Sequence, residues 1–368
     1  MSEPITYAAA GVDTRAGDTA VELMKDAVRA THGPNVVGGV GGFAGLYDAT
    51  ALKRYQRPLL ATSTDGVGTK VAIAQAMDTH DTIGYDLVGM VVDDIVVMGA
   101  EPLMMTDYIA CGQVVPDRIA DIVRGIAAAC QQAGTALVGG ETAEHPGLLG
   151  PEEYDVAGAA TGVVEAEELL GPERVQVGDR LVALAASGLH SNGYSLVRRV
   201  IEVAGWELDR HVEEFGRTLG AELLEPTRVY AADCLALTRT ADVHAFTHVT
   251  GGGLAANLAR VLPAGLVADV QRDSWEVPPV FDVVRRLGEV PWTDLQNTLN
   301  LGVGMVAVVP PEELETVLAT CTERNLPAWE LGTVRTAEDV SGEDAPVVSG
   351  TKGVDGGGVR LLGEYRTV

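Results

Sequence analysis

The chain has 368 residues, with 52 acidic and 26 basic side chains and a formal net charge of −26 at pH 7. Such a surplus of negative charge argues against nucleic acid and anionic membrane surfaces as partners, because both attract basic proteins. Hydrophobic residues make up 46% of the chain, enough for a substantial core, and the length is typical of two domains.

The first part of the chain predicts alternating helices and strands. After irregular residues 1–16 we expect a helix from Asp18 to about Thr31 and a glycine-rich loop over residues 38–45. Strands are then predicted at 58–64, 103–109, 135–138 and 154–164, with helices at 82–99 and 116–133. The acidic stretch 165–173 contains Gly171-Pro172 and is typical of a linker.

A second alternating pattern begins at Asp179. Strands are expected at 181–186 and 243–249, and a helix at 194–204. We therefore expect an N-terminal domain over residues 1–168 and a C-terminal domain over 169–335. An acidic, polar tail with a terminal strand is expected over 336–368.

The cysteines and the termini point to an ordinary cytoplasmic protein. Cys111, Cys130, Cys234 and Cys321 form no Cys-x-x-Cys pair and show no metal-ligand spacing, so we expect reduced, mostly buried thiols. The first residues lack the pattern of a signal peptide, and no apolar run reaches the ~18 residues of a membrane span.

Asp65 directly follows a predicted strand and precedes the turn Gly66-Val67-Gly68-Thr69-Lys70. A carboxylate at a strand end beside a glycine turn and a lysine suits Mg²⁺ and phosphate, although an Asp-Gly turn is also a common structural feature. Lys70 strengthens the functional interpretation, because only four of the 26 basic residues are lysines.

Three aspartates lie in the predicted helix 82–99. Asp86 and Asp93 are seven residues apart and share a face, while Asp94 lies just over a quarter-turn away. Carboxylates in so apolar a helix are costly unless they are paired or bind a cation, and the alternative is a solvated helix face.

Two glycine-containing loops follow strands in the second half, at 187–193 and 250–253. Each can hold a phosphate with free backbone N–H groups, or can simply be a helix cap and tight turn. His190 and His248 lie in or beside these loops, and either is able to transfer a proton. The sequence holds no P-loop and no nucleophile elbow.

Taken in order, the motifs are a specific set. The chain closely resembles the phosphoribosylformylglycinamidine cyclo-ligase (aminoimidazole ribonucleotide synthetase) family from about residue 7 to 334. The resemblance rests on segments at 7–13, 41–43, 64–70, 99–103, 107–108, 139–144, 154–158, 190–198, 226–228, 250–253 and 302–305.

This resemblance implies an N-terminal mixed α/β domain whose strands pair across a homodimer, and a C-terminal α+β domain. It implies ATP-dependent ring closure of formylglycinamidine ribonucleotide in the cleft between them, through phosphorylation of the formyl amide oxygen. Mg²⁺ is the expected metal ion and K⁺ a further candidate.

The resemblance also assigns residues by motif. Asp65 and Asp94 become metal ligands, and the catalytic residues become His190, Lys70 and Asp94, with His190 leading for proton transfer. The ATP and phosphate contacts become Gly41, Gly42, Asp65, Gly66, Gly68, Thr69, Lys70 and Glu141. The contacts to the ribonucleotide substrate become His190, Ser191, Asn192, Gly193, Thr250, Gly251 and Gly252.

The chain departs from the family pattern at Asp93, where Asn is usual, and at His145, where Met is frequent. The family's scaffold is shared by other enzymes, which the sequence argues against. A selenophosphate synthetase needs a reactive cysteine near the N-terminus, and a thiamine monophosphate kinase would lack the 190–198 string. The remaining alternative, a catalytically inactive nucleotide-binding protein, is disfavoured by Asp65, Lys70 and Asp94.

Overall fold

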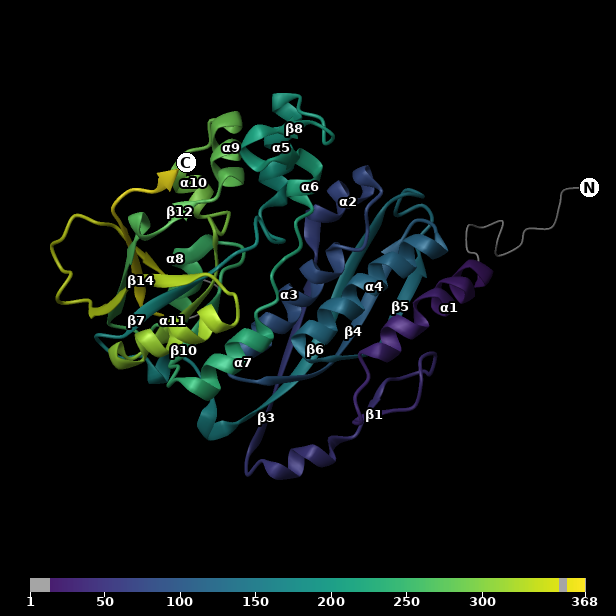
Figure 1. Cartoon of the computed structure of the whole chain (residues 1–368), viewed down its shortest axis with the longest axis horizontal. Coiled ribbons are helices and arrows are strands. Elements are labelled where there is room, and N and C mark those ends of the chain that lie inside the picture. Colours follow the sequence, from purple (N-terminus) through teal and green to yellow (C-terminus); the bar gives the residue numbers. More distant parts are fainter. Residues whose placement is uncertain (1–13, 351–355, 368) are drawn as a thin grey trace, which may run out of the picture.

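The computed structural model describes residues 14–350 and 356–367, which form two α/β parts lying side by side (Figure 1). Residues 1–13, which include the motif at 7–13 and most of the segment expected to be irregular, lie outside the described residues, as do residues 351–355 and 368 of the expected tail. Each part is built around one main sheet, as the α/β and α+β prediction requires.

The N-terminal part contains a four-stranded sheet in the order β3-β6-β4-β5. Strand β6 is antiparallel to both β3 and β4, whereas β4 and β5 run parallel. The strands are β3 (Pro58–Gly66), β4 (Glu101–Cys111), β5 (Ala136–Glu144) and β6 (Tyr154–Glu165), with a small hairpin of β1 (Val36–Val37) and β2 (Leu46–Tyr47) beside them.

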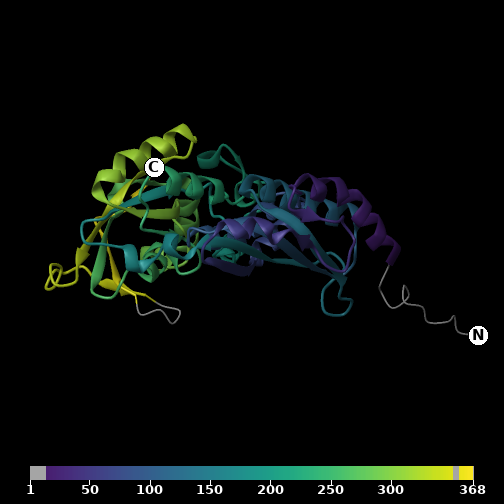
Figure 2. The ribbon, with the colours of Figure 1, turned by 90° about the horizontal axis from the view of Figure 1, so that it is seen from below.

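Helices cover one face of this sheet. Helix α3 packs on β3 and β6, α4 packs on α3, and α1 packs on α4. On the opposite face β3 exposes every second residue, including Leu60, Thr62 and Thr64. Figure 2 shows the molecule turned by 90°, with α1 at the end of the N-terminal part that lies away from the C-terminal part. The helices are α1 (Thr14–Ala30), α2 (Val71–Met77), α3 (Ile83–Val96) and α4 (Pro116–Ala133).

The C-terminal part contains a mixed seven-stranded sheet in the order β10-β13-β7-β14-β11-β16-β15. Its strands are β7 (Arg180–Ala185), β10 (Ala245–His248), β11 (Leu266–Gln271), β13 (Val303–Val309), β14 (Ala328–Thr336), β15 (Val347–Ser349) and β16 (Gly358–Leu362). Two short pairs accompany it: β8 (His211–Val212) with β9 (Arg217–Thr218), and β12 (Glu276–Val277) with β17 (Arg366–Thr367).

The helices of this part are mostly short. They are α5 (Tyr194–Ala204), α6 (Leu219–Leu223), α7 (Ala231–Thr240), α8 (Gly253–Leu258), α9 (Pro279–Gly288), α10 (Trp292–Gln296) and α11 (Leu314–Glu323). Helix α7 contacts α3 and α4 as well as α11, so it joins the two parts of the molecule.

Local signals set several helix ends. Helix α4 begins at Pro116 and ends before Gly134, whose φ of 72° few other residues adopt. Helix α5 ends in the same way before Gly205. Both helices have their expected bounds, and all four cysteines are free and buried, as predicted.

Three expected boundaries are wrong. Helix α1 begins at Thr14, inside the segment expected to be irregular. Helix α3 ends at Val96, before Gly99 with its φ of 77°. The predicted strand 135–138 continues through Gly139 and Gly140, because both glycines pair with β4 at Thr106 and Asp107.

The region expected as an acidic tail, 336–368, contributes three strands to the fold. Strand β16 lies parallel beside β11 and carries Arg360, which is 1% exposed and donates two hydrogen bonds of 2.7 Å to the Asp269 carboxylate. A buried, bidentate ion pair therefore fixes this segment to the sheet. No helix among the described residues is long and apolar enough to cross a membrane.

Candidate active site at the junction of the two parts

Helix α3 carries the three aspartates singled out in the sequence, and all three bind the C-terminal part. Asp86 accepts hydrogen bonds from Thr227, Asp93 accepts the Tyr230 backbone N–H at 3.0 and 3.1 Å, and Asp94 lies 2.9 Å from His248 Nδ1. The expectation that carboxylates in this apolar helix need partners is correct. Their partners are Lys70 and groups of the C-terminal part, rather than only a bound metal cation.

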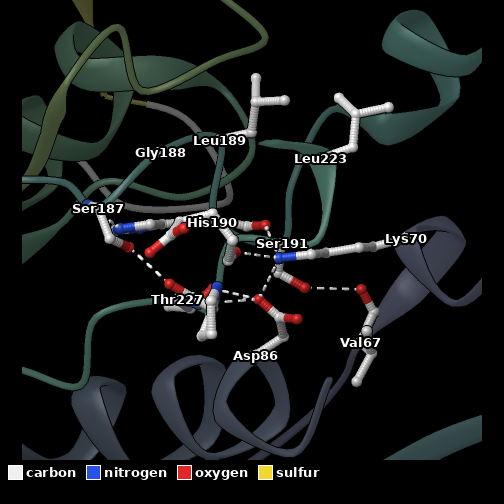
Figure 3. A network of polar contacts seen from close by, with 12 residues as sticks. Val67, Lys70, Asp86, Ser187, Gly188, Leu189, His190, Ser191, Leu223 and Thr227 are labelled. Atoms are coloured by element: carbon white, nitrogen blue, oxygen red, sulfur yellow. Dashed lines mark hydrogen bonds and ion pairs between the residues drawn. The ribbon is translucent and has the colours of Figure 1, made fainter. Parts of the chain in front are cut away.

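Lys70 lies at the centre of this junction (Figure 3). Its Nζ is fully buried and donates to Asp86 Oδ1 at 2.7 Å, to the His190 carbonyl at 3.0 Å and to the Glu225 carbonyl at 2.7 Å. An ammonium group has three protons, and these three acceptors use them all. In this arrangement no proton of Lys70 is left for the contact with an ATP phosphate that its motif predicts, and that contact stays a prediction.

Burial governs the ionisation of this pair. It lowers the pKa of Lys70 and raises the pKa of Asp86, while the attraction between the two groups opposes both shifts. Asp86 Oδ2 has no hydrogen-bond partner and is buried. The attraction between Lys70 and Asp86 therefore offsets the cost of removing both groups from water, and this compensation is lost when either partner is removed.

His190 is built into a loop rather than presented to solvent. It is 4% exposed, has a φ of 61°, and its Nε2 accepts the Ser187 backbone N–H at 3.2 Å. Burial, with the charges of His248 and Lys70, lowers the pKa of His190 well below its usual value, so the ring is neutral. This geometry does not favour His190 as the leading group for proton transfer.

His248 has the opposite electrostatic environment. Burial acts to lower its pKa, but the hydrogen bond to Asp94 and the charges of Asp93, Asp94 and Asp65 outweigh burial and raise it. His248 ends strand β10, directly before the loop 250–253, and its side chain is 3% exposed. The structure therefore brings an imidazole with a raised pKa together with Asp65 and Asp94, the two predicted metal ligands.

Asp65 and Asp94 provide the oxygen ligands that Mg²⁺ prefers. Asp65 Oδ1 accepts the Gly66 N–H at 2.7 Å, and the Asp94 side chain is 43% exposed. The described residues contain no group of three or more His, Cys, Asp or Glu side chains placed to hold a metal. This fits Mg²⁺ in nucleotide sites, where one or two carboxylates act together with phosphates and water.

The predicted phosphate turn leads from Asp65 into Lys70. Gly66 ends β3, and Gly68 has a φ of 73°, which glycine adopts without strain. Thr69 Oγ1 lies 3.3 Å from Ser195 Oγ in α5, so this turn reaches the C-terminal part.

The two predicted substrate loops lie on the C-terminal side of this junction. Ser191 Oγ donates to the Val67 carbonyl at 2.7 Å, Asn192 is half-buried, and Gly193 precedes α5 with a φ of 81°. In the other loop Thr250 and Gly251 are held by Asn257, whose Nδ2 donates to the Thr250 carbonyl at 3.1 Å.

The second loop is shaped by close backbone packing. Gly252 has a φ of 105°, and a Cβ atom at the neighbouring Gly253 would lie 1.8 Å from the Gln296 carbonyl oxygen. The backbone itself therefore requires glycine at positions 252 and 253. The exposed Gly251 and the half-buried Thr250 are left at the loop surface.

The glycine-rich loop covers a separate, mainly apolar pocket of about 220 Å³. Gly41, Gly42 and Glu141, three predicted ATP contacts, line it together with apolar residues of α1 such as Met24. Asp107 also lines it and is 8% exposed; burial raises its pKa to about 7. The Asp107 carboxyl group in this mainly apolar pocket is suited to accepting a hydrogen bond from a ligand amino group.

Sequence reasoning noted Asp107 only within a family motif and assigned it no contact, missed Tyr230, and placed His248 second to His190. Asp107 sits one strand from Gly140 and would collide with any side chain there, so the paired glycines were a usable signal. Tyr230 acts through its backbone N–H, for which the sequence contains no signal.

Comparison with known proteins identifies the family of the chain. The model for the N-terminal domain of AIR synthase related proteins matches residues 47–164, and the model for their C-terminal domain matches 176–344. "Phosphoribosylformylglycinamidine cyclo-ligase" of Geobacillus sp. (strain WCH70) is 48% identical over 336 residues, or 91% of this chain and 97% of that relative. The protein of the same name from Desulfitobacterium hafniense (strain DSM 10664 / DCB-2) is 49% identical over 84% of this chain and 91% of its own.

Solved structures share the fold at lower identity. Thiamine-monophosphate kinase from Stenotrophomonas maltophilia K279a has a TM-score of 0.65 at 21% identity, covering 93% of this chain and 96% of its own. The hydrogenase maturation protein HypE in complex with ATP has a TM-score of 0.59 at 18% identity, covering 90% and 89%. These likenesses concern the fold alone.

Proposed function

The chain belongs to the phosphoribosylformylglycinamidine cyclo-ligase family, whose members are ligases of purine biosynthesis, and we propose that its junction site performs their reaction. ATP and formylglycinamidine ribonucleotide are converted to aminoimidazole ribonucleotide, ADP and phosphate. The observation that carries the proposal is identity near 48% over 91% of the chain. The convergence of Asp65 and Asp94 on His248 supports the placement of the site.

The chemistry explains why such a site needs charge. An amide oxygen is a poor leaving group, so ring closure requires its conversion to a phosphate ester before the ring nitrogen attacks. Phosphoryl transfer is accelerated mainly by positioning and by neutralising charge on the moving group. Asp65 and Asp94 would hold Mg²⁺, which supplies that neutralisation when it is bound with ATP. K⁺ stays a prediction without assigned ligands.

The residues of this chain take distinct parts in the proposal. The turn Gly66–Thr69 and His248 face the phosphates, while Ser191–Gly193 and Thr250–Gly252 hold the substrate's own phosphate or ribose. Lys70 is assigned to positioning, because its three protons are used within the protein. His190 is assigned to positioning because its Nε2 accepts the Ser187 N–H, while its buried Nδ1 has no hydrogen-bond partner among the described residues. Lys70 fixes the substrate loop through the His190 carbonyl rather than touching ATP.

The pocket under the glycine-rich loop is proposed for the base of ATP. Its apolar walls suit a flat ring, and Asp107 suits an amino group. The pocket and Asp65 belong to one sheet: Asp65 and Asp107 both pair with Gly158, from opposite sides of β6. The spacing of strands then sets the backbones of Asp65 and Asp107 about 10 Å apart across the sheet.

The decisive experiment incubates the purified chain with formylglycinamidine ribonucleotide, ATP and Mg²⁺ and measures ADP and aminoimidazole ribonucleotide. Both products should appear together. Asp65→Asn should lower the rate at saturating ribonucleotide, whereas Asp209→Asn, an exposed aspartate, serves as matched control. A folded wild-type chain that forms neither product would refute the function, and an unchanged rate in Asp65→Asn would remove Asp65 from the site.

A homodimer is the second part of the proposal. Support comes from the face of the N-terminal sheet that lies opposite its described helices, where Leu60 is 63% and Tyr108 41% exposed. Burial of such a face by an identical face is a common route to C2 dimers. The Leu60→Glu variant should shift the molar mass in light scattering from dimer to monomer. A monomeric wild-type chain would refute the homodimer without affecting the proposed reaction. A cytoplasmic location stays a prediction.

A further inference from the structure

One segment supports both proposed substrate loops. Residues 296–302, called here the supporting segment, join α10 to β13. Asn300 is 5% exposed, and its Nδ2 donates to the carbonyls of Gly188 at 3.0 Å and Leu189 at 3.2 Å. Its own Oδ1 accepts the Gly302 N–H at 2.8 Å, so its amide is used on both sides.

The same segment lies against a glycine of each loop. A Cβ atom at Gly193 would come within 2.3 Å of Leu299 Cδ2, and one at Gly253 within 1.8 Å of the Gln296 carbonyl oxygen. Backbone packed this closely leaves no space for independent movement. A shift of the supporting segment must therefore shift both loops.

The C-terminal end of the chain holds this segment. The ring of Tyr365 lies 4.8 Å from that of Trp292 and 5.7 Å from that of Trp275, measured between centroids, and the Arg272 guanidinium lies 5.2 Å from its centre. The Tyr365 hydroxyl donates to Gln296 Oε1 at 3.1 Å. Aromatic contacts of this kind stabilise beyond the area they cover.

Trp275 connects the same cluster to the other end of the segment. Its Nε1 donates to the Leu301 carbonyl at 2.9 Å, and Leu301 has a φ of 51°. The aromatic cluster of Trp275, Trp292 and Tyr365 therefore fixes the supporting segment at both Gln296 and Leu301.

We propose that Tyr365 is a positioning residue of the active site, acting through the supporting segment on the two substrate loops. Tyr365 lies beyond residue 344, where the match to the family's C-terminal domain ends. The C-terminal end of this chain thereby contributes to substrate binding without touching substrate. The inference rests on the proposed assignment of the two loops to the ribonucleotide.

The first test compares Tyr365→Ala and Tyr365→Phe with Glu364→Ala, an exposed neighbour that serves as control. Tyr365→Ala should raise KM for formylglycinamidine ribonucleotide about tenfold and leave KM for ATP within about twofold, because loss of uniform binding appears in KM. Tyr365→Phe removes only the hydroxyl and should show a smaller change in the same direction.

The second test does not need activity. Hydrogen–deuterium exchange should accelerate at residues 187–193 and 250–253 in Tyr365→Ala, and not in β3 to β6 or in Glu364→Ala. If Tyr365→Ala does not fold, Gln296→Leu, which removes the acceptor, replaces it. Unchanged exchange in the loops, or equal acceleration throughout the chain, overturns the inference. A wild-type chain without activity would instead refute the proposed function, and the exchange result would still decide this one.

Discussion

Replacement of Lys70 by methionine tests whether this residue joins the two parts or binds ATP. The change keeps the length of the side chain but removes the ammonium group, leaving the fully buried Asp86 carboxylate without its ion partner. Breaking a buried pair on one side costs about 3–5 kcal/mol of folding free energy. The carbonyls of His190 and Glu225 lose their donor in the same step.

The second half of this test removes the carboxylate as well. In the double variant Lys70→Met with Asp86→Leu neither charge of this pair is left buried, so most of the cost of an unpaired buried charge disappears. Thr227 then keeps an unpaired N–H and hydroxyl, and the two carbonyls stay unpaired, which leaves a deficit of about 1–3 kcal/mol. The double variant should therefore be more stable than Lys70→Met alone.

Urea denaturation followed by circular dichroism measures the free energy of unfolding for the wild type, the two single variants and the double variant. The reasoning requires strong non-additivity between positions 70 and 86. Additive effects, or a loss below about 1 kcal/mol in Lys70→Met, would refute it. Unchanged stability combined with a large rise in KM for ATP would instead restore Lys70 to the phosphate site.

Three further outcomes are expected. Asp65→Asn should unfold within about 1 kcal/mol of wild type while using Mg·ATP at least tenfold less efficiently, measured as kcat/KM. Because burial raises the pKa of Asp107 to about 7, the folded chain binds this proton more tightly than the unfolded chain between about pH 4 and 7, and stability falls as pH rises through that window. In Asp107→Asn the free energy of unfolding, measured by urea denaturation, should fall less steeply with pH, by up to about 1.4 kcal/mol per pH unit. An unaltered slope would contradict the raised pKa of Asp107. Gly304→Ala should cost about 1–3 kcal/mol because its Cβ would meet Tyr230 Oη at 2.0 Å, whereas Gly139→Ala, with open space, should change the melting temperature far less.

Sequence patterns predict those elements whose ends are set locally. Pro116 and Gly134 bound α4, and Gly193 and Gly205 bound α5, so both helices could be delimited from neighbouring residues alone. The pair Gly139-Gly140 has the opposite outcome. It reads as a turn, but it lies inside β5 because β4 supplies hydrogen bonds and Asp107 fills the space that a side chain at Gly140 would need.

The site was predicted as far as residue type allows. The composition of α3 indicates that its aspartates need partners, yet nothing in the sequence tells that Thr227, Tyr230 and His248 provide them. For Lys70 the neighbouring glycines favoured a phosphate contact, while its three acceptors come from Asp86, His190 and Glu225. Such choices depend on the packing of distant segments, which local patterns do not encode.

The place of β16 in the sheet has a consequence for how the chain is made. Strand β11 pairs with β14 on one side and with β16 on the other, so its second edge stays open until residues 358–362 have been synthesised. An open edge that carries buried Val267 and Val270 is a template for pairing with other chains. Asp269 on the same strand also waits for Arg360, its buried ion partner. The C-terminal sheet is therefore completed only after residues 358–362 have been synthesised, and a chain that lacks β16 would expose the edge of β11 and be prone to aggregate.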